Sequence, residues 1–108
     1  MFRVVYRFLT QPGQEPIFIK AWEELTKLIY EYEGSLGSIL HKESDNCFLA
    51  YASWTNKEVW EASGNNLPKI AEKWRSAMRN SCESVETIHE MELISDLSKT
   101  RIYNENDA

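Results

Sequence analysis

The sequence predicts an α+β fold built as a split β-α-β-β-α-β unit, in which helices cover one face of a four-stranded antiparallel sheet. Two observations predict it. Some segments repeat apolar residues at the three-to-four spacing of amphipathic helices, whereas others alternate as strands do, and the two kinds follow one another in that order. At 108 residues the chain is long enough for one domain with one hydrophobic core.

The first half of this unit is expected as a strand at residues 2–9 and a helix at residues 16–33. The strand carries apolar side chains on both faces, and Gln11-Pro12-Gly13 predicts the turn after it. Proline suits a first helical turn and glycine suits a helix end, as Pro16 and Gly34 would provide. The buried stripe of this helix is expected to be Phe18, Trp22, Leu25, Ile29 and Tyr32.

The second half begins with strands at residues 36–43 and 47–54, joined by a polar hairpin loop at 43–46. The sequence Thr55-Asn56-Lys57-Glu58 matches a capping box, in which Thr55 and Glu58 satisfy each other's N–H groups, and it predicts a short helix to about residue 62. A helix then restarts at Pro68, and its buried stripe is expected to be Leu67, Ile70, Ala71, Trp74 and Met78.

The last strand is expected at residues 84–94, with alternate residues on one face: Val85, Thr87, His89, Met91 and Leu93. We therefore expect one domain over residues 1–97 and a loose polar tail over residues 98–108. The strands at 2–9 and 47–54 are apolar on both faces, yet the helices can cover one face alone. A second copy of the chain is the expected cover, so the sequence predicts a homodimer formed through the sheet.

The net charge of −5 and the isoelectric point near 5.0 argue against partners bound through phosphate, so we expect neither nucleic acid nor an anionic membrane. The first residues alternate as in a strand, so neither a signal peptide nor a membrane-spanning helix is expected. Cys47 and Cys82 are too few and too far apart for a disulfide scaffold or a zinc site. We expect a cytoplasmic protein with reduced thiols and no bound metal.

Several segments resemble the antibiotic biosynthesis monooxygenase (ABM) domain family: Phe18-Ile19-Lys20-Ala21-Trp22, residues 33–41, Ala50-Tyr51-Ala52-Ser53-Trp54, the helix with Trp60, and the strand opening Ser84-Val85-Glu86. The resemblance implies a ferredoxin-like fold that pairs into a dimeric α/β barrel. It also implies a range of activities. The family includes cofactor-independent monooxygenases of polycyclic phenols, haem-degrading enzymes, quinol oxygenases, and members without a known activity.

The haem-degrading branch of the family implies an iron-ligating histidine beyond the tryptophan of the second helical region. Trp60 matches that tryptophan, but residues 61–81 contain no histidine. Tyr6 stands at the first-strand position where these relatives carry asparagine. Haem would therefore have no axial ligand here. A phosphate-binding glycine loop is also missing from the sequence, so we expect no cofactor.

The quinone-forming relatives imply a catalytic asparagine and tryptophan one helical turn apart, which Asn56 and Trp60 match at i, i+4. The tyrosine found beyond this pair in those relatives is missing. An amide can hold a phenolate or enolate oxygen, and an indole can pack on a flat ring. The plain alternative is that Asn56 starts a helix and that Trp60 belongs to the core.

His41 and His89 are the two side chains that titrate near neutral pH, so His41 is a further candidate base and His89 a candidate ligand-binding group. Both are also consistent with structural residues on a sheet. Tyr6, Tyr51, Trp54 and Trp74 are candidates to line a flat aromatic pocket, or else to pack as core.

Two functions follow as hypotheses. The first is an ABM-type, cofactor-independent monooxygenase acting on a small aromatic or polycyclic phenolic substrate, which it deprotonates, orients and desolvates. The second is a non-catalytic dimer of the same fold that binds a small ligand or acts in stress. Polar groups converging on a pocket would favour the first, and a filled core would favour the second.

Overall fold

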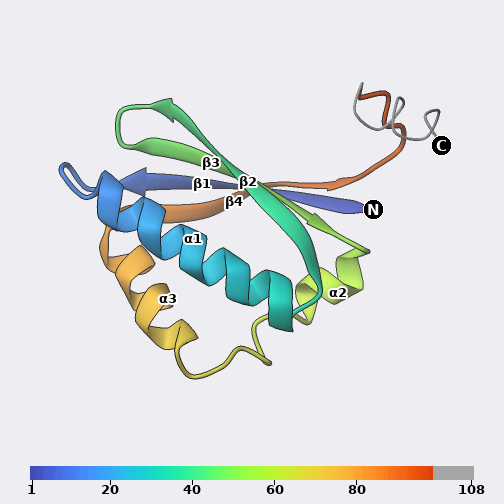
Figure 1. Ribbon diagram of the computed structural model, residues 1–108. Coiled ribbons are helices and arrows are strands. Elements are labelled where there is room, and N and C mark those ends of the chain that lie inside the picture. Colours follow the sequence, from blue (N-terminus) through green and yellow to red (C-terminus); the bar gives the residue numbers. More distant parts are fainter. Residues whose placement is uncertain (99–108) are drawn as a thin grey trace.

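The computed structural model describes residues 1–98 and confirms the predicted α+β fold (Figure 1). One antiparallel sheet has the strand order β2-β3-β1-β4, formed by β1 (Phe2–Thr10), β2 (Ser35–Ser44), β3 (Cys47–Trp54) and β4 (Cys82–Glu92). The helices in this part of the chain are α1 (Glu15–Tyr32), α2 (Lys57–Glu61) and α3 (Ala71–Asn80). Apart from Ser98, the predicted tail lies outside the described residues, so the domain limit at residue 97 stays a prediction.

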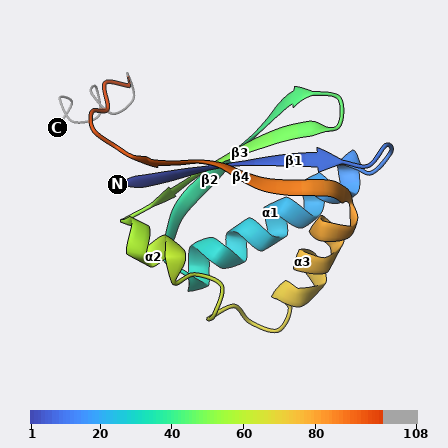
Figure 2. The ribbon, with the colours of Figure 1, turned by 180° about the vertical axis from the view of Figure 1, so that it is seen from behind.

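The molecule has two layers. Helices α1 and α3 lie side by side against one face of the sheet, and α2 sits at one end of it (Figures 1 and 2). Neither view shows a helix over the opposite face, which we call the open face. The elements follow the β-α-β-β-α-β order of the split βαβ unit. This order places the helices on one face of the sheet, as the sequence predicts.

The core forms where the central strands β1 and β3 meet α1. The rings of Phe8 and Phe48 flank Phe18 of α1, with centroid distances of 4.9 and 5.0 Å. Phe18 and Leu25 are 0 and 5% exposed, but Tyr32 is 46% exposed, so its place in the predicted buried stripe is wrong. These residues are spaced seven apart, and a helix with 3.6 residues per turn drifts about 20° per heptad. After two heptads the stripe has rotated off the core.

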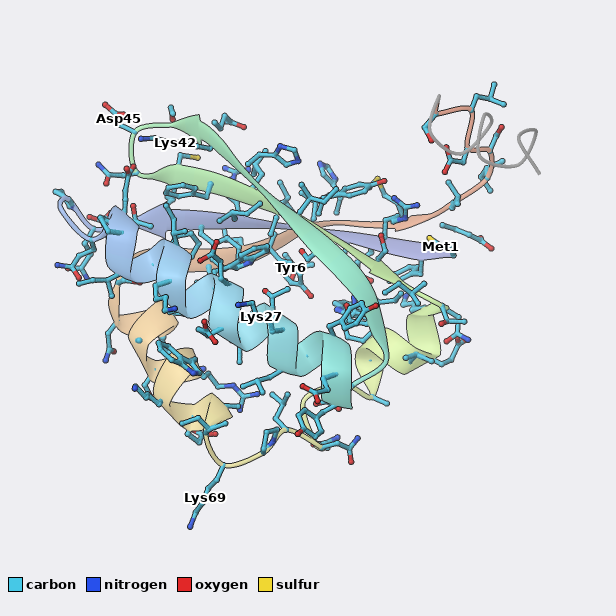
Figure 3. All side chains as sticks on the ribbon, in the orientation of Figure 1. Met1, Tyr6, Lys27, Lys42, Asp45 and Lys69 are labelled. Carbon is cyan, nitrogen blue, oxygen red and sulfur yellow. The ribbon has the colours of Figure 1, made fainter. Side chains whose placement is uncertain are left out.

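The hairpin between β2 and β3 is tighter than the predicted four-residue loop. Ser44 pairs with Cys47, which leaves Asp45 and Asn46 as the turn. Asn46 has φ of 61°, a left-handed conformation that asparagine tolerates better than most residues. The Glu15 carboxylate at the start of α1 accepts the Asn46 N–H at 2.7 Å and a Lys42 ammonium N–H at 3.0 Å (Figure 3 labels Lys42 and Asp45).

The predicted capping box before α2 is wrong. Asn56, not Thr55, is the N-cap residue: its side-chain oxygen accepts the backbone N–H of Val59 at 2.9 Å. Asparagine and threonine both cap helices, and a shift of one position is within the usual ambiguity of helix ends. The loop after α2 is tied to the end of α1, because the buried Glu33 carboxylate accepts N–H groups from Gly64 and Asn66.

Two further expectations for the second half are wrong in detail. α3 begins at Ala71 rather than Pro68, because residues 68–71 first form a turn closed by the Ala71 N–H and the Pro68 carbonyl. Ile70 therefore lies before the helix and is 52% exposed, outside the buried stripe.

Strand β4 also breaks the predicted alternation. Its register against β1 shifts between Val5, opposite His89, and Tyr6, opposite Thr87. The extra residue, Ile88, is a β-bulge, which reverses the faces of the residues before and after it. Val85 and Thr87 therefore share the helix side of the sheet with Tyr6 and Phe8, whereas His89 and Met91 lie on the open face.

Candidate functional site

An apolar cavity of about 160 Å³ lies between α1, α3 and the sheet. All four strands and both long helices contribute to its wall, and none of the lining side chains is charged. The lining residues are Tyr6, Phe8, Trp22, Leu25, Thr26, Ile29, Ser35, Ser38, Ala52, Trp54, Met78 and Val85.

Among the residues that line the cavity, Tyr6 carries the ionisable side chain. It stands in the middle of β1 on the helix side, between the sheet and α1 (Figure 3). Burial raises the pKa of the phenol, and the charge of Glu90 adds to this rise against the opposing hydrogen bond from Trp60. At neutral pH the hydroxyl is therefore protonated, so it can donate a hydrogen bond.

Trp60 supports Tyr6 from α2. Its indole N–H donates to the Tyr6 hydroxyl oxygen at 2.8 Å, and its ring packs on Phe2 with a centroid distance of 5.7 Å. Trp60 does not line the cavity itself. Because its N–H is already used, it positions Tyr6 rather than presenting a free donor. Among the described residues the Tyr6 O–H has no acceptor, which leaves that proton for a bound molecule.

Trp54 places an indole ring on the cavity wall. It is the last residue of β3, is 3% exposed, and pairs across the sheet with Phe2 and Ser35. Its ring belongs to the same apolar cluster as Val4 and Ala52, against which Tyr6 and Trp60 pack. The Trp54 indole N–H has no acceptor within the described part of the chain.

The structure separates Asn56 from the cavity. Asn56 is exposed, and its side-chain oxygen is occupied by the helix cap. It lines a different, polar hollow at the start of α2, together with Met1, Lys57, Glu58 and Glu92. The i, i+4 spacing with Trp60 is real, but the two side chains face different surroundings: a solvent-exposed cap and the Tyr6 hydroxyl.

The two histidines lie on the open face, away from the cavity. His41 belongs to β2 and His89 to β4, the outer strands of the sheet, and both are exposed. Three strand spacings, together with an offset of two residues along the strands, put them more than about 14 Å apart. Tyr51 of β3 also lies on this face, where its hydroxyl accepts an Arg3 guanidinium N–H at 2.6 Å. These residues do not form one site with Tyr6.

Trp74 is half-buried on α3, and Lys73 places its ammonium 4.7 Å from the ring centroid. It is not a cavity residue. Of the four aromatic candidates for a pocket, the structure therefore brings together Tyr6 and Trp54. Trp22 of α1 is a wall residue that was not predicted, because its place in the apolar stripe of the helix is equally typical of a core residue. No pattern in the sequence could have identified three further wall residues, Thr26, Ser35 and Ser38.

Residues 1–98 contain no cluster of three or more metal-ligating side chains. They also contain no helix with the length and hydropathy needed to cross a membrane.

Residues 1–78 match the protein family described as antibiotic biosynthesis monooxygenase. Solved structures share the fold at low sequence identity. SnoaB, a cofactor-independent oxygenase from Streptomyces nogalater, is 15% identical with a TM-score of 0.72, over 91% of this chain and 97% of SnoaB. No curated protein sequence matches the chain.

Two other structures are similar to the same extent. Rv0793 from Mycobacterium tuberculosis is 10% identical with a TM-score of 0.69, over 90% of this chain and 98% of Rv0793. A Chloroflexus aurantiacus protein that carries the same family name is 14% identical with a TM-score of 0.72, over 90% of this chain and 96% of its own. At these identities the likeness shows the fold.

Proposed function

This chain belongs to the antibiotic biosynthesis monooxygenase family, and from that premise we propose that it oxygenates a small, electron-rich aromatic substrate without a cofactor. The observation that carries the proposal is an uncharged cavity that contains a protonated phenol, Tyr6, held by Trp60. An apolar wall with few polar groups is the usual form of a site for a flat organic ligand. The likeness to SnoaB, a cofactor-independent oxygenase, supports the same reading.

The proposed reaction needs molecular oxygen and no other reactant. The substrate, written R₂CH₂, has a CH₂ carbon whose acidity is raised by conjugation with the substrate's own phenol ring. This carbon loses one proton to water, and the resulting anion transfers an electron to O₂. The radical pair combines, forming a C–O bond and a peroxide that takes up a proton. Loss of the second C–H proton then cleaves the O–O bond and gives R₂CO and H₂O. Both oxygen atoms and all electrons are accounted for: R₂CH₂ + O₂ → R₂CO + H₂O.

The residues of the cavity act on the anion rather than on oxygen. None of the lining side chains is a carboxylate or a histidine, so the proton leaves to solvent. The Tyr6 O–H donates to the phenolate oxygen and stabilises the charge as it develops. The apolar walls exclude water from the peroxide and hold the ring flat.

Oxygen uptake with a panel of hydroquinones, naphthohydroquinones and anthrones, in the presence of a metal chelator, tests this proposal. We expect uptake with at least one class, with one O₂ consumed per substrate. Val85→Trp should lower it, because Val85 lines the cavity and is 46% exposed, so a larger ring there would obstruct the entrance. Trp at Glu83, which lies on the same strand and does not line the cavity, should not lower it. Equal uptake by wild type and Val85→Trp would contradict the proposal.

We further propose that the protein is a homodimer formed through the open face. This face carries Val5, Leu9, Leu49 and Tyr51, all half-buried in the single chain, and Ile39, which is exposed. A twofold axis brings the same patch of two chains together, so the apolar patch of one sheet can cover its copy in the partner. Light scattering at micromolar concentration should give twice the mass of 12.6 kDa, and a stable monomer would contradict the proposal.

One observation favours the second candidate, a dimer that binds a small ligand without chemistry. The cavity holds donors but no general base, so its polar groups can recognise an oxygen atom and need not promote a reaction. Tight binding of an aromatic phenol with no oxygen uptake above the rate in buffer would select this candidate.

A further inference from the structure

We infer that Glu33 is a positioning residue of the candidate site: its buried carboxylate holds the loop after α2, and this loop keeps the Trp60 indole on the Tyr6 hydroxyl. Glu33 does not line the cavity, so it acts through other residues. The inference rests on the proposed function only through Tyr6, the donor that Trp60 holds in the cavity wall.

Helix α2 cannot hold Trp60 in place by itself. None of its five residues, Lys57–Glu61, is buried, and a helix of this length is not stable without contacts to the rest of the protein. One such contact is the ion pair between Lys57 and Glu90, with 3.7 Å between Nζ and Oε1. These side chains are 52 and 43% exposed, and exposed ion pairs contribute little stability. The position of Trp60 therefore depends on packing and on what holds the chain that follows α2.

The carboxylate of Glu33 holds this following segment. Glu33 is the C-cap residue of α1 and is 7% exposed. One of its oxygens accepts the backbone N–H of Gly64 and, at 3.4 Å, that of Asn66, and the other accepts the Asn66 side-chain amide at 3.1 Å. Hydrogen bonds to a carboxylate are stronger than those between neutral groups. The loop is therefore attached to the end of α1 by the strongest kind of acceptor that a side chain offers.

Ser63 connects this loop to Trp60. Its backbone N–H and its hydroxyl both donate to the Trp60 carbonyl oxygen, at 3.1 and 2.6 Å. Ser63 directly precedes Gly64, so a single residue separates the Trp60 carbonyl from the N–H that Glu33 accepts. Releasing the loop from Glu33 would therefore free the C-terminal end of α2, and with it the indole that donates to Tyr6.

Hydrogen exchange of the Trp60 indole N–H, followed by NMR well below the melting temperature, tests the inference with two substitutions of similar size. Glu33→Met removes the acceptor, and we expect the Trp60 proton to exchange about tenfold faster or more, the effect of losing one hydrogen bond to a charged group. Glu33→Gln keeps an oxygen for the Gly64 N–H and, with the Asn66 amide turned over, a second bond. Its exchange should stay within about threefold of wild type.

Glu15→Gln is the matched control, because it weakens a contact between a carboxylate and a backbone N–H at the other end of α1. It should speed exchange of the Phe48 amide in the central strand β3, which reports unfolding of the whole domain, and leave the Trp60 indole as in wild type. Unchanged Trp60 exchange in Glu33→Met would overturn the inference. A rise at Trp60 that follows the Phe48 amide in Glu15→Gln as well would also overturn it, because Glu33 would then stabilise the fold as a whole.

Asn66→Ala keeps the inference testable if Glu33→Met does not fold. Asn66 is exposed, and the substitution removes one of the N–H groups that the Glu33 carboxylate accepts. We expect Trp60 exchange to rise about two- to tenfold, the effect of one ordinary hydrogen bond. The same exchange rate as in wild type would overturn the inference.

Oxygen uptake separates this inference from the proposed reaction. Because Tyr6 is proposed to stabilise the anion as it develops, Glu33→Met should lower kcat by a larger factor than it changes KM. Absence of uptake by wild type would contradict the proposed function, whereas the exchange rates of Trp60 would still decide the role of Glu33.

Discussion

The indole N–H of Trp60 donates to the hydroxyl of Tyr6 at 2.8 Å, although the two residues are 54 positions apart in the chain. This contact joins the short helix α2 to the middle of the central strand β1. It fixes the Tyr6 ring in the wall of the cavity and leaves the phenol proton for a bound molecule. The candidate site therefore depends on a side chain, Trp60, that does not touch the cavity.

Replacing Tyr6 by phenylalanine should therefore affect both stability and activity. The Trp60 N–H would lose its acceptor in a half-buried place, so the free energy of unfolding should fall by about 1–3 kcal/mol. Oxygen uptake should fall as well, because the developing anion loses its donor. Urea unfolding and an oxygen electrode measure the two effects. Tyr30→Phe, on the exposed side of α1, is the control and should change neither.

The raised pKa of Tyr6 predicts how stability depends on alkaline pH. Burial is its main cause, so ionisation is disfavoured in the folded protein compared with the unfolded chain, where the pKa is near 10. The stability is then fully present below about pH 10 and is lost as pH rises through the folded pKa. Urea midpoints above pH 10 should fall more steeply for wild type than for Tyr6→Phe. Parallel slopes would show that Tyr6 titrates as it does in the unfolded chain.

Asn56 offers a test that separates a structural role from a catalytic one. Asn56→Ala should cost about 1 kcal/mol of stability, because it removes the cap of α2. Asn56→Ser keeps a capping oxygen and removes the amide, so it should restore the melting temperature. Since Asn56 does not line the cavity, we expect Asn56→Ser to bind aromatic ligands as wild type does. Loss of oxygen uptake in stable Asn56→Ser would instead place the amide in the mechanism.

The open face predicts a variant that separates the protomers. Leu49→Glu puts a carboxylate on the open face of β3, across from Arg7 on β1 and His41 on β2, and burying that charge in a dimer interface destabilises the dimer because the cost of removing it from water can exceed the gain from its neighbours. Light scattering should show the monomer mass. Ile17→Glu, on an exposed position of α1 away from the sheet, should remain a dimer. Dimers of Leu49→Glu as stable as wild type would place the interface elsewhere.

The hairpin contact predicts acid sensitivity. The pKa of Glu15 is lowered, first by the Asn46 backbone N–H and then by Lys42. A lowered folded pKa contributes stability above the unfolded value, near 4.5, and this contribution is lost as pH falls through the folded pKa. Glu15→Gln should therefore melt below wild type at pH 7 and approach it at pH 3. A constant difference across this range would contradict the assignment.

The order of strands and helices was predictable from the sequence, because alternation and the spacing of Phe18, Leu25 and their neighbours depend on local geometry alone. Details that depend on tertiary context were not. The bulge at Ile88 puts His89 and Val85 on opposite faces of the sheet, and no residue type in this strand predicts a bulge. The candidate site could be predicted only in part, for the same reason. Trp60 was a candidate because of its spacing from Asn56, but its contact with Tyr6 depends on the packing of residues 54 positions apart in the chain.

The most direct test of the proposed oxygenation is turnover of the best substrate under ¹⁸O₂, with the product analysed by mass spectrometry. We predict one ¹⁸O atom in each product molecule, at a rate that Val85→Trp and Tyr6→Phe both lower. An unlabelled product, or a labelled one formed equally fast by Val85→Trp, would contradict the claim that this cavity is the site of oxygenation.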